Sequence, residues 1–449
     1  MSQENNGEAL TLKKGALGFK DVLIFGLLFM VPIAPISVFG EVAKASGNKV
    51  PLVYLIACIA MIFTGLSYYH FSKKYPMSGS VYTYITKGIN PYIGFIAGWI
   101  ILLDYFFIPA LLYKTMGIYV NDAVGAPWWV WAVATIALVT IVNLLGITDL
   151  SRVNWVCLIL ECICLVVVIA LAIKFVGGGG GFGKAVIDPL YEKGALTPQF
   201  IATACSIACL SFLGFDGIST LAEETRNPEK TVGKAIIAAI IVAGFIFVFQ
   251  TYIYELAWGG KDPSVFPDAM GFYVVFDQFA SGWVYSLVQG IFIVAIFVNV
   301  LVGQAGAARI VFGMARDRNL PGFFAKISPK RQAPYTATIG IAVVSLGVMF
   351  IPYETLVLLV NIGAISSFIL LDIAVIWHFV GLNKQYKSVK DWILYIICPI
   401  LGAAILVFVL TGFSWITYVV LGGWIVIGLI ILGIRTKGFK ETPGQIEGI

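Results

Sequence analysis

The sequence predicts an all-α integral membrane protein with twelve transmembrane helices, and three observations support this fold class. Hydrophobic residues make up 59% of the 449-residue chain and charged residues only 12%, whereas soluble domains carry about 25% charged residues. Apolar runs near the roughly 20 residues of a spanning helix recur along the chain. None of these runs shows the alternation typical of a membrane β-barrel strand. Because only helices and closed barrels satisfy their backbone in lipid, we expect a helical bundle.

The apolar runs define twelve predicted spans joined by short loops. The inner loop at 73–91 is amphipathic and is expected to lie along the membrane surface before the third span. The longest outer loop contains GGGGGFG at 177–183, a flexible linker by composition. The predicted spans are 20–44, 50–72, 91–118, 127–147, 150–175, 198–222, 232–258, 280–306, 335–351, 353–380, 391–411 and 414–435.

Basic residues concentrate on one side of this arrangement. With the N-terminus inside, 22 of the 29 lysines and arginines lie in inner segments, and Lys114 lies within a span. By the positive-inside rule, we expect a multi-pass protein of the cytoplasmic membrane with both termini in the cytoplasm. The net charge of +5 then reflects the inner surface and not nucleic-acid binding. The outer segments hold Lys44, Lys49, Lys174, Lys184, Lys193 and Lys261.

Two spans carry helix-breaking residues at mid-membrane depth. The first contains Pro32 and Pro35, each of which lacks an N–H and clashes with the preceding helical turn. The sixth contains Gly214 and Gly217 within SFLGFDGIST. Two interrupted helices five spans apart are typical of a transporter built from an inverted repeat, whose substrate and ion sites lie where the broken helices meet. The freed backbone is tolerated only where it faces protein or a water-filled cavity.

This pattern predicts the domain organisation. A ten-helix inverted-repeat transport core is expected over 20–382, with helices 1–5 at about 20–175 and helices 6–10 at about 198–380. Two additional transmembrane helices follow over 383–435, and 1–19 and 436–449 are predicted cytoplasmic tails. The seven cysteines all fall in apolar runs and are interpreted as small core residues, with no metal or cofactor expected.

Acidic residues within the spans are the candidates for chemistry, because charges at membrane depth are rare and usually functional. Asp216 in the second break either contacts substrate or proton, or caps the half-helix that follows it. Glu161 in the fifth span either carries a proton or pairs with an amine, or else links two helices. Asp104 and Asp372 are interpreted mainly as helix–helix hydrogen bonds, with Asp104 kept as a further cavity carboxylate. A cavity lined in this way favours cations or protons.

The first break is a poor site for a carboxylate. A broken helix that holds a carboxylate usually uses glycines, whose consecutive N–H groups form an anion nest. Residues 33–38 offer the Ser37 hydroxyl, but no glycine occurs before Gly40 and two donors are lost to proline. The unpaired carbonyls that remain favour cationic groups. Aromatic residues near the breaks either pack or form a cation–π wall for an ammonium: Phe212, Phe215, Tyr105, Tyr82 and Trp99.

Three segments together resemble the amino acid–polyamine–organocation (APC) superfamily. SFLGFDGISTLAEETRNPEKTVGKAI (211–236) resembles its sixth-helix region, with Gly–Phe–Asp at the break and Glu–Glu–Thr and Asn–Pro at the inner end. AARIVFGMARDRNLP (307–321) resembles the segment after the eighth helix. YPMSGSVYTYITKGINPYIGFIAGWIILLDY (75–105) resembles the loop and third helix. The resemblance covers nearly the whole chain and implies the LeuT-type fold with a five-plus-five inverted repeat.

Within the superfamily the sequence looks most like bacterial putrescine importers of the PuuP type. Amino-acid permeases usually carry a glycine-rich first break, and PIAPISVFG departs from that pattern. The resemblance implies uptake of a diamine, which has no carboxylate, driven by the proton gradient. In several family members a lysine in the fifth helix replaces a coupling sodium, and Glu161 lies at about that position here. Lysine-based coupling is therefore not carried over, and protonation of Glu161 replaces it as the hypothesis.

The predicted function is a secondary active transporter that imports a putrescine-like amine with H⁺ by alternating access. An amino-acid permease or amine/amino-acid exchanger is the alternative within the superfamily, and a transporter-like membrane sensor is the alternative of another class. No nucleophile–base pair, metal cluster or phosphate loop indicates an enzyme. Membrane lipid is an expected partner, and no obligate protein partner is evident. Expected substrate contacts are Ile33, Ala34, Ser37, Ser211, Phe212, Phe215 and Asp216, and expected proton-coupling residues are Glu161 and Asp216.

Overall fold

The structure is a computed structural model that describes residues 15, 17–77, 79–145, 150–191, 197–280, 282–316, 320–328 and 334–443, with the backbone alone at 150–154. Most of the predicted N-terminal tail and the end of the C-terminal tail, residues 1–14 and 444–449, lie outside the described residues. Some of the basic residues counted for the positive-inside rule also lie outside the described residues. These are Lys13, Lys14, Lys193, Arg318, Lys330, Arg331 and the side chain of Arg152.

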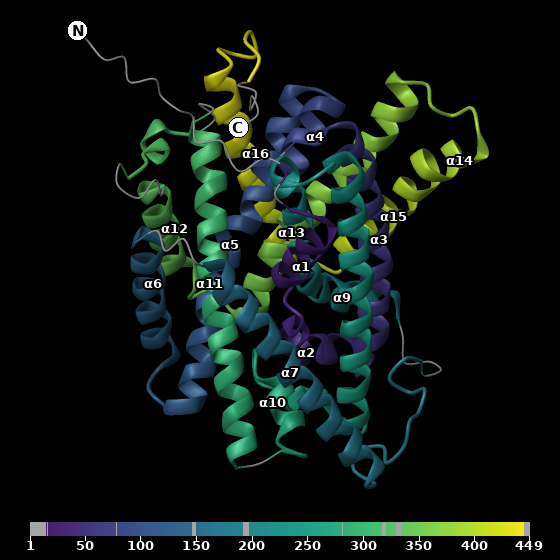
Figure 1. The fold of residues 1–449 in the computed structure, drawn as a ribbon, viewed down its shortest axis with the longest axis vertical. Coiled ribbons are helices and arrows are strands. Elements are labelled where there is room, and N and C mark those ends of the chain that lie inside the picture. Colours follow the sequence, from purple (N-terminus) through teal and green to yellow (C-terminus); the bar gives the residue numbers. More distant parts are fainter. Residues whose placement is uncertain are drawn as a thin grey trace.

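Throughout its described part the chain is a bundle of helices without strands (Figure 1). The α-helices are α1 (Phe19–Met30), α2 (Ala34–Ser46), α3 (Val50–Lys74), α4 (Ser80–Gly88), α5 (Pro91–Val124), α6 (Trp128–Leu145), α7 (Leu150–Gly177), α8 (Pro198–Ala208), α9 (Pro228–Trp258), α10 (Gly271–Phe276), α11 (Trp283–Arg316), α12 (Tyr335–Val348), α13 (Tyr353–Val375), α14 (Val389–Trp392), α15 (Cys398–Leu410) and α16 (Trp415–Arg435). Shorter 3₁₀ and π segments are η1 (Cys209–Phe212), η2 (Phe215–Glu224), η3 (Pro263–Val265), η4 (Gly322–Ala325), η5 (Ile376–Leu382) and η6 (Ile393–Ile397).

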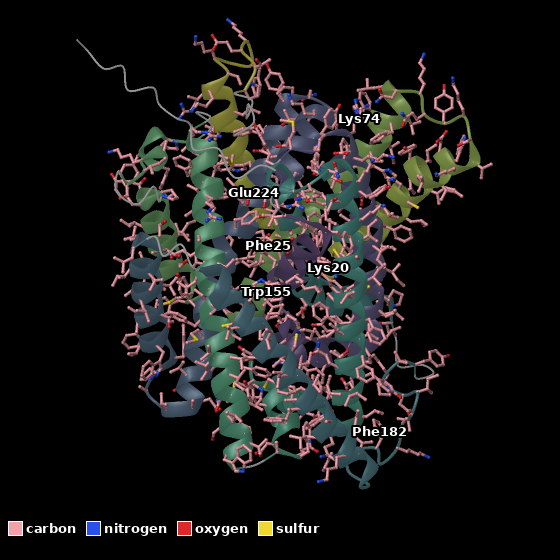
Figure 2. All side chains as sticks on the ribbon, viewed as in Figure 1. Lys20, Phe25, Lys74, Trp155, Phe182 and Glu224 are labelled. Atoms are coloured by element: carbon pink, nitrogen blue, oxygen red, sulfur yellow. The ribbon has the colours of Figure 1, made fainter. Side chains whose placement is uncertain are left out.

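Helices lie at the positions of all twelve predicted spans. Ten helices of the described chain are long and apolar enough to cross a membrane, and the pair α1–α2, bent by 44°, makes an eleventh. The twelfth, α12, is apolar but has only 14 residues. The largest difference from the prediction is α11, which continues to Arg316 and not to residue 306. Lys74, at the end of α3, and Phe182, in the glycine-rich loop, lie at opposite ends of the bundle (Figure 2).

The segment 73–91 was predicted to lie along the membrane surface, and in the structure protein covers most of its helix. Its helix α4 is buried along almost its whole length and packs against α5, α13 and η2. Tyr84 of α4 stacks on the ring of Phe71. An amphipathic pattern shows that a helix has one apolar face, but not whether lipid or protein covers that face. Here protein covers it, beside the second helix break.

The first break separates α1 from α2. α1 ends at Met30, and Val31 adopts a positive φ of 55°, which a β-branched residue rarely does. Pro32 follows in the unwound turn, where its missing N–H interrupts no helical hydrogen bond. Pro35 lies in the first turn of α2, a position that tolerates proline because its N–H would be unpaired anyway. Pro32 therefore lies in the break itself, and Pro35 begins the second half-helix.

The second break separates α8–η1 from η2 and meets the first. Leu213 is extended and Gly214 has φ 110°, a conformation that favours glycine. A Cβ added to Gly214 would lie 2.9 Å from the carbonyl oxygen of Phe29, so backbone from the two broken helices is in close contact. Gly217 lies inside η2 without a positive φ. Among the predicted break residues, Gly214 and Pro32 thus interrupt the helices.

The broken helices lie at the centre of the bundle. α3 and α9 pack against each other and against the broken helices, and α5 and α13 pack together beside them. α6, α7, α15 and α16 lie further out and expose large apolar side chains. This arrangement places the two breaks away from the apolar surface and inside protein, as unpaired backbone requires.

Candidate functional site

A cavity of about 180 Å³ lies where the two breaks meet. Its walls come from both broken helices and from α5, α7, α11 and the first residue of α13. Seven of the predicted site residues line it, together with the break residue Gly214: Ile33, Ala34, Ser37, Asp104, Glu161, Ser211 and Asp216. The structure therefore brings side chains from the first, third, fifth and sixth predicted spans to one space.

Asp216 begins the first turn of η2 and is held by hydroxyl groups from two other helices. Its side chain is 4% exposed. The carboxylate oxygen Oδ2 accepts hydrogen bonds from the hydroxyls of Tyr105, at 3.3 Å, and Ser80, at 3.4 Å. Asp216 therefore lines the cavity while its carboxylate is held by hydroxyls of α4 and α5.

Glu161 and Asp104 face the same cavity with free hydrogen-bonding capacity. Glu161 of α7 is 4% exposed, and its side chain makes no hydrogen bond within the described residues. Asp104 of α5 is 5% exposed, and its Oδ1 is likewise without a hydrogen-bond partner there. None of the described residues that line the cavity is a lysine, arginine or histidine. With three carboxyl groups and no basic side chain, the lining attracts cations.

The backbone of the first break offers few donors. Between residues 31 and 36 the two prolines have no N–H. The N–H groups of Val31, Ala34 and Ile36 donate to the carbonyls of Leu27, Val31 and Ile33, at 3.0, 2.8 and 3.0 Å. Within the described structure, only the N–H of Ile33 has no acceptor in this turn. A single free N–H cannot form the nest that a carboxylate requires.

The carbonyls of the break are tied to neighbouring helices. Gln250 of α9 donates its Nε2 to the carbonyl of Pro32 at 2.9 Å. The hydroxyl of Tyr353, the first residue of α13, donates to the carbonyl of Ser37 at 3.0 Å. The Ser37 hydroxyl itself donates back to the carbonyl of Ala34. The unwound segment is therefore held from two sides by buried polar side chains.

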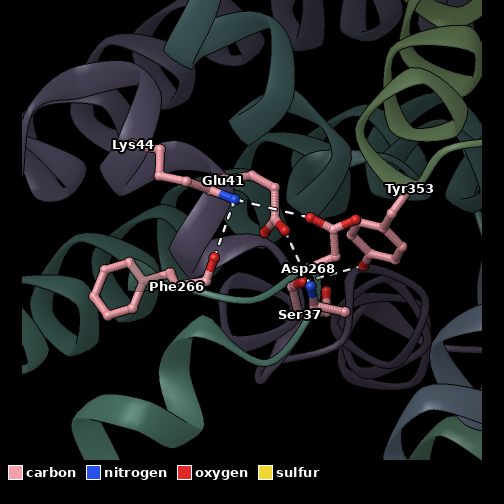
Figure 3. A network of polar contacts seen from close by, with 7 residues as sticks. Ser37, Glu41, Lys44, Phe266, Asp268 and Tyr353 are labelled. Carbon is pink, nitrogen blue, oxygen red and sulfur yellow. Dashed lines mark hydrogen bonds and ion pairs between the residues drawn. The ribbon is translucent and has the colours of Figure 1, made fainter. Parts of the chain in front are cut away.

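The half-helix α2 is also tied to the loop that precedes α10 (Figure 3). Glu41, one turn beyond Ser37 and 3% exposed, accepts the N–H of Ala269 at 3.0 Å. Lys44 contacts the same loop through a carbonyl and an aspartate. Gly40 packs against Gly271, since a Cβ added to Gly40 would lie 2.9 Å from the Gly271 Cα. Movement of α2 must therefore move this loop or break these contacts.

Several predicted residues lie outside the cavity. Phe212 is buried against Tyr54 and Phe247, and Phe215 is buried against Tyr68 and Phe368. Neither ring lines the cavity. The short 3₁₀ turns around the break rotate both rings into the core, which a count along an α-helix does not reproduce.

Other polar residues of the spans are engaged away from the site. Asp372 is fully buried and accepts hydrogen bonds from Ser67, at 2.6 Å, and Thr64, at 3.5 Å. Lys114 donates to the carbonyl of Ile351 and lies over the ring of Trp128. Asp372 thus links helices, and Lys114 packs near the outer end of α5.

One wall of the cavity was not predicted from the sequence. No residue of the eighth span was expected at the site, yet α11 contributes Phe292, Ile296, Val298, Asn299, Val302, Gly303 and Gly306. Ser80 as a partner of Asp216 and Tyr353 as a lining residue were not predicted either. The only signal in the sequence for the α11 wall was its two glycines at i and i+3, which by themselves do not indicate a cavity.

Comparisons with known proteins agree with this architecture. Residues 21–436 match the family described as amino acid permease. The chain is 31% identical to the low-affinity putrescine importer PlaP of Escherichia coli K12, over 99% of this chain and 98% of PlaP. It is 28% identical to the branched-chain amino acid permease BcaP of Bacillus subtilis, over 94% and 93% of the two chains. A methylthioribose transporter of the same bacterium is 26% identical over 93% and 92%.

A solved structure shares the fold. The crystal structure of MhsT in complex with L-phenylalanine superposes with a TM-score of 0.63 at 15% identity, covering 90% of this chain and all of MhsT. This likeness confirms the LeuT-type fold predicted from the two broken helices. The family match covers nearly all of the chain, and the named relatives are transporters and not enzymes. The chain therefore belongs to the amino acid permease family of the APC superfamily, a family of multi-pass membrane transporters for amino acids and amines.

Proposed function

We propose that the protein imports a small organic amine, putrescine or a similar diamine, across the cytoplasmic membrane together with H⁺ and by alternating access. The observation that carries this proposal is the cavity lining. Asp104, Glu161 and Asp216 line it without a basic side chain among the described residues. Charges of one sign around a buried cavity attract the opposite charge more strongly than charges in bulk water, because the effective dielectric inside a protein is lower.

The backbone at the break supports an amine over an amino acid. The carboxylate of an amino acid needs convergent N–H donors, and the first break has one free N–H, at Ile33. Three carboxyl groups would also repel that carboxylate. An ammonium group has the opposite requirements, since it donates to carboxylates and carbonyls. The likeness to an importer of putrescine agrees with this choice.

Two carboxyl groups have separate roles in the proposed cycle. Asp216 accepts the ammonium group near Ile33, Ala34, Ser37 and Ser211, in an orientation kept by hydroxyl donors. Glu161 carries the proton, because it lines the cavity. Its side chain makes no hydrogen bond within the described structure, so no bond there holds it in one protonation state. Ionisable groups within transmembrane helices commonly mark substrate pathways and proton relays.

A branched-chain amino-acid permease is the second candidate. Most of the cavity wall is apolar and includes Leu111, Leu210, Phe292 and Ile296, which suit a branched side chain. The likeness to BcaP supports the same reading. This candidate requires the carboxylate to bind despite the acidic lining, and for this reason it stands second.

Uptake by the purified protein in liposomes tests the proposal. Labelled putrescine and labelled isoleucine are compared under an imposed pH gradient, with protein-free liposomes as the control. We expect gradient-driven putrescine uptake that unlabelled isoleucine does not inhibit. Isoleucine uptake without competition by putrescine would establish the second candidate instead. Putrescine uptake at the same rate with and without the pH gradient would refute coupling to H⁺.

A further inference from the structure

The α11 wall of the cavity contains two glycines whose presence needs an explanation. The lining residues Phe292, Ile296, Asn299, Gly303 and Gly306 follow a spacing of four, three, four and three, which places them on one face of the helix. Glycine in a helix interior is destabilising by about 1 kcal/mol relative to alanine. Two glycines on this face are therefore costly to helix stability.

The usual structural reasons for a glycine do not apply to these two. Neither Gly303 nor Gly306 has a positive φ. A Cβ at Gly303 would meet only the side chains of Leu112 and Ile108, at the ordinary contact distances of 3.5 and 3.9 Å, and a Cβ at Gly306 would meet nothing within 4 Å. By contrast, a Cβ at Gly244 of α9 would lie 2.2 Å from a sulfur atom, so that glycine is required by packing.

α5 and α11 pack side by side (Figure 1). Gly303 leaves room for about one methyl group against α5, and Gly306 faces open space. We call this space beside the two glycines the slot. The two helices run antiparallel along the chain. Gly303 faces Ile108 and Leu112, so Gly306, one turn further inward on α11, lies at about the level of Asp104, one turn inward on α5. Both residues line the cavity. Asp104 is nearly fully buried there, with Oδ1 still unpartnered within the described structure.

An apolar slot that ends at an unpaired carboxylate matches an unbranched chain with an ammonium at its far end. We infer that Gly303 and Gly306 set the chain length of the substrate and that Asp104 binds the second ammonium of a diamine. Ile108 and Leu112 then pack against the methylene chain. This inference rests on the proposed amine transport and assigns specificity to residues other than Asp216 and Glu161.

Competition binding with the purified full-length protein tests the inference. Labelled putrescine is displaced by diaminopropane, cadaverine and butylamine, for the wild type and for Gly306→Val. The control is Gly313→Val on the same helix, where an added Cβ also meets nothing and which does not line the cavity. Gly306→Val should favour the shorter diamine by about fourfold for each methylene that no longer fits. Gly313→Val should keep the wild-type order.

The second variant addresses the far end of the chain. Asp104→Asn should lower the preference for putrescine over butylamine by about tenfold or more, because a charge-assisted hydrogen bond is lost. Binding of butylamine itself should change little. Equal weakening of all competitors in Gly306→Val, or an unchanged diamine preference in Asp104→Asn, would overturn the inference while leaving amine transport intact. A wild type that binds no amine at all would instead refute the proposed function.

Discussion

The substitution Asp216→Asn tests the central assignment, because the chain provides a matched control. Asp216 and Asp372 are both buried carboxyl groups that accept hydrogen bonds from two hydroxyls. Only Asp216 lines the cavity. Asparagine has the same shape but keeps only one oxygen acceptor. At Asp216 both hydroxyls donate to Oδ2, so asparagine can keep both bonds. At Asp372 the hydroxyls donate to different oxygens, so asparagine keeps one bond and loses the other.

The expected effect follows from the contact between ammonium and carboxylate. A hydrogen bond to a charged group contributes about 1.5–3 kcal/mol, and about 1.4 kcal/mol corresponds to a tenfold change in Kd. Asp216→Asn should therefore weaken putrescine binding by roughly 10- to 100-fold. Asp372→Asn should leave Kd unchanged, although it changes a hydrogen-bonded link between α3 and α13 and so alters thermal stability.

Ligand-induced thermal stabilisation measures both quantities on the same samples. At a putrescine concentration about 100 times the wild-type Kd, binding should stabilise the wild type by about 2.7 kcal/mol. A tenfold weaker variant should gain about 1.4 kcal/mol at the same concentration. If Asp216→Asn shows the full wild-type stabilisation, Asp216 does not bind the ammonium group. If Asp372→Asn loses the same amount, the effect arises from the fold and not from the site.

Three further substitutions probe coupling and gating. Glu161→Gln should abolish the dependence of putrescine uptake on the pH gradient and should preserve the exchange of labelled for unlabelled putrescine. Gradient-driven uptake at the wild-type rate would exclude Glu161 as the proton carrier. Gly40→Val should lower the thermal midpoint through a loss of about 1–3 kcal/mol, because its side chain would overlap Gly271, and an unchanged midpoint would mean that the loop is not held at this contact. Tyr353→Phe should also speed the reaction of an externally applied thiol reagent with a cysteine introduced by Ser37→Cys. The reason is that the hydrogen bond from Tyr353 to the backbone of the half-helix α2 is lost. Equal labelling rates with and without Tyr353→Phe would show that this bond does not keep that side closed.

Features that depend on local sequence were predictable. The spans follow from apolar runs, since each must cross the same thickness of lipid. The two breaks follow from Pro32 and Gly214, because proline lacks the N–H of a helical hydrogen bond and glycine readily adopts a positive φ. The candidate carboxylates follow from the rarity of charge in lipid. Asp104, Glu161 and Asp216 were found in this way, and the tertiary structure places all three on one cavity.

Features that depend on the phase of a helix or on distant partners required the tertiary structure. The 3₁₀ turns around Gly214 rotate Phe212 and Phe215 into the core, because each residue turns the chain by more than in an α-helix. Ser80 reaches Asp216 across 136 positions of sequence, and its helix lies inside protein although its pattern also suits a membrane surface. The α11 wall could not be predicted either, because the sequence does not distinguish a glycine that borders a cavity from a glycine that permits close packing. The sequence by itself determined which residues are unusual for a membrane helix, because that depends on local backbone and solvation. Only the tertiary structure decided which of them share a cavity, because that depends on how each helix is rotated against its neighbours.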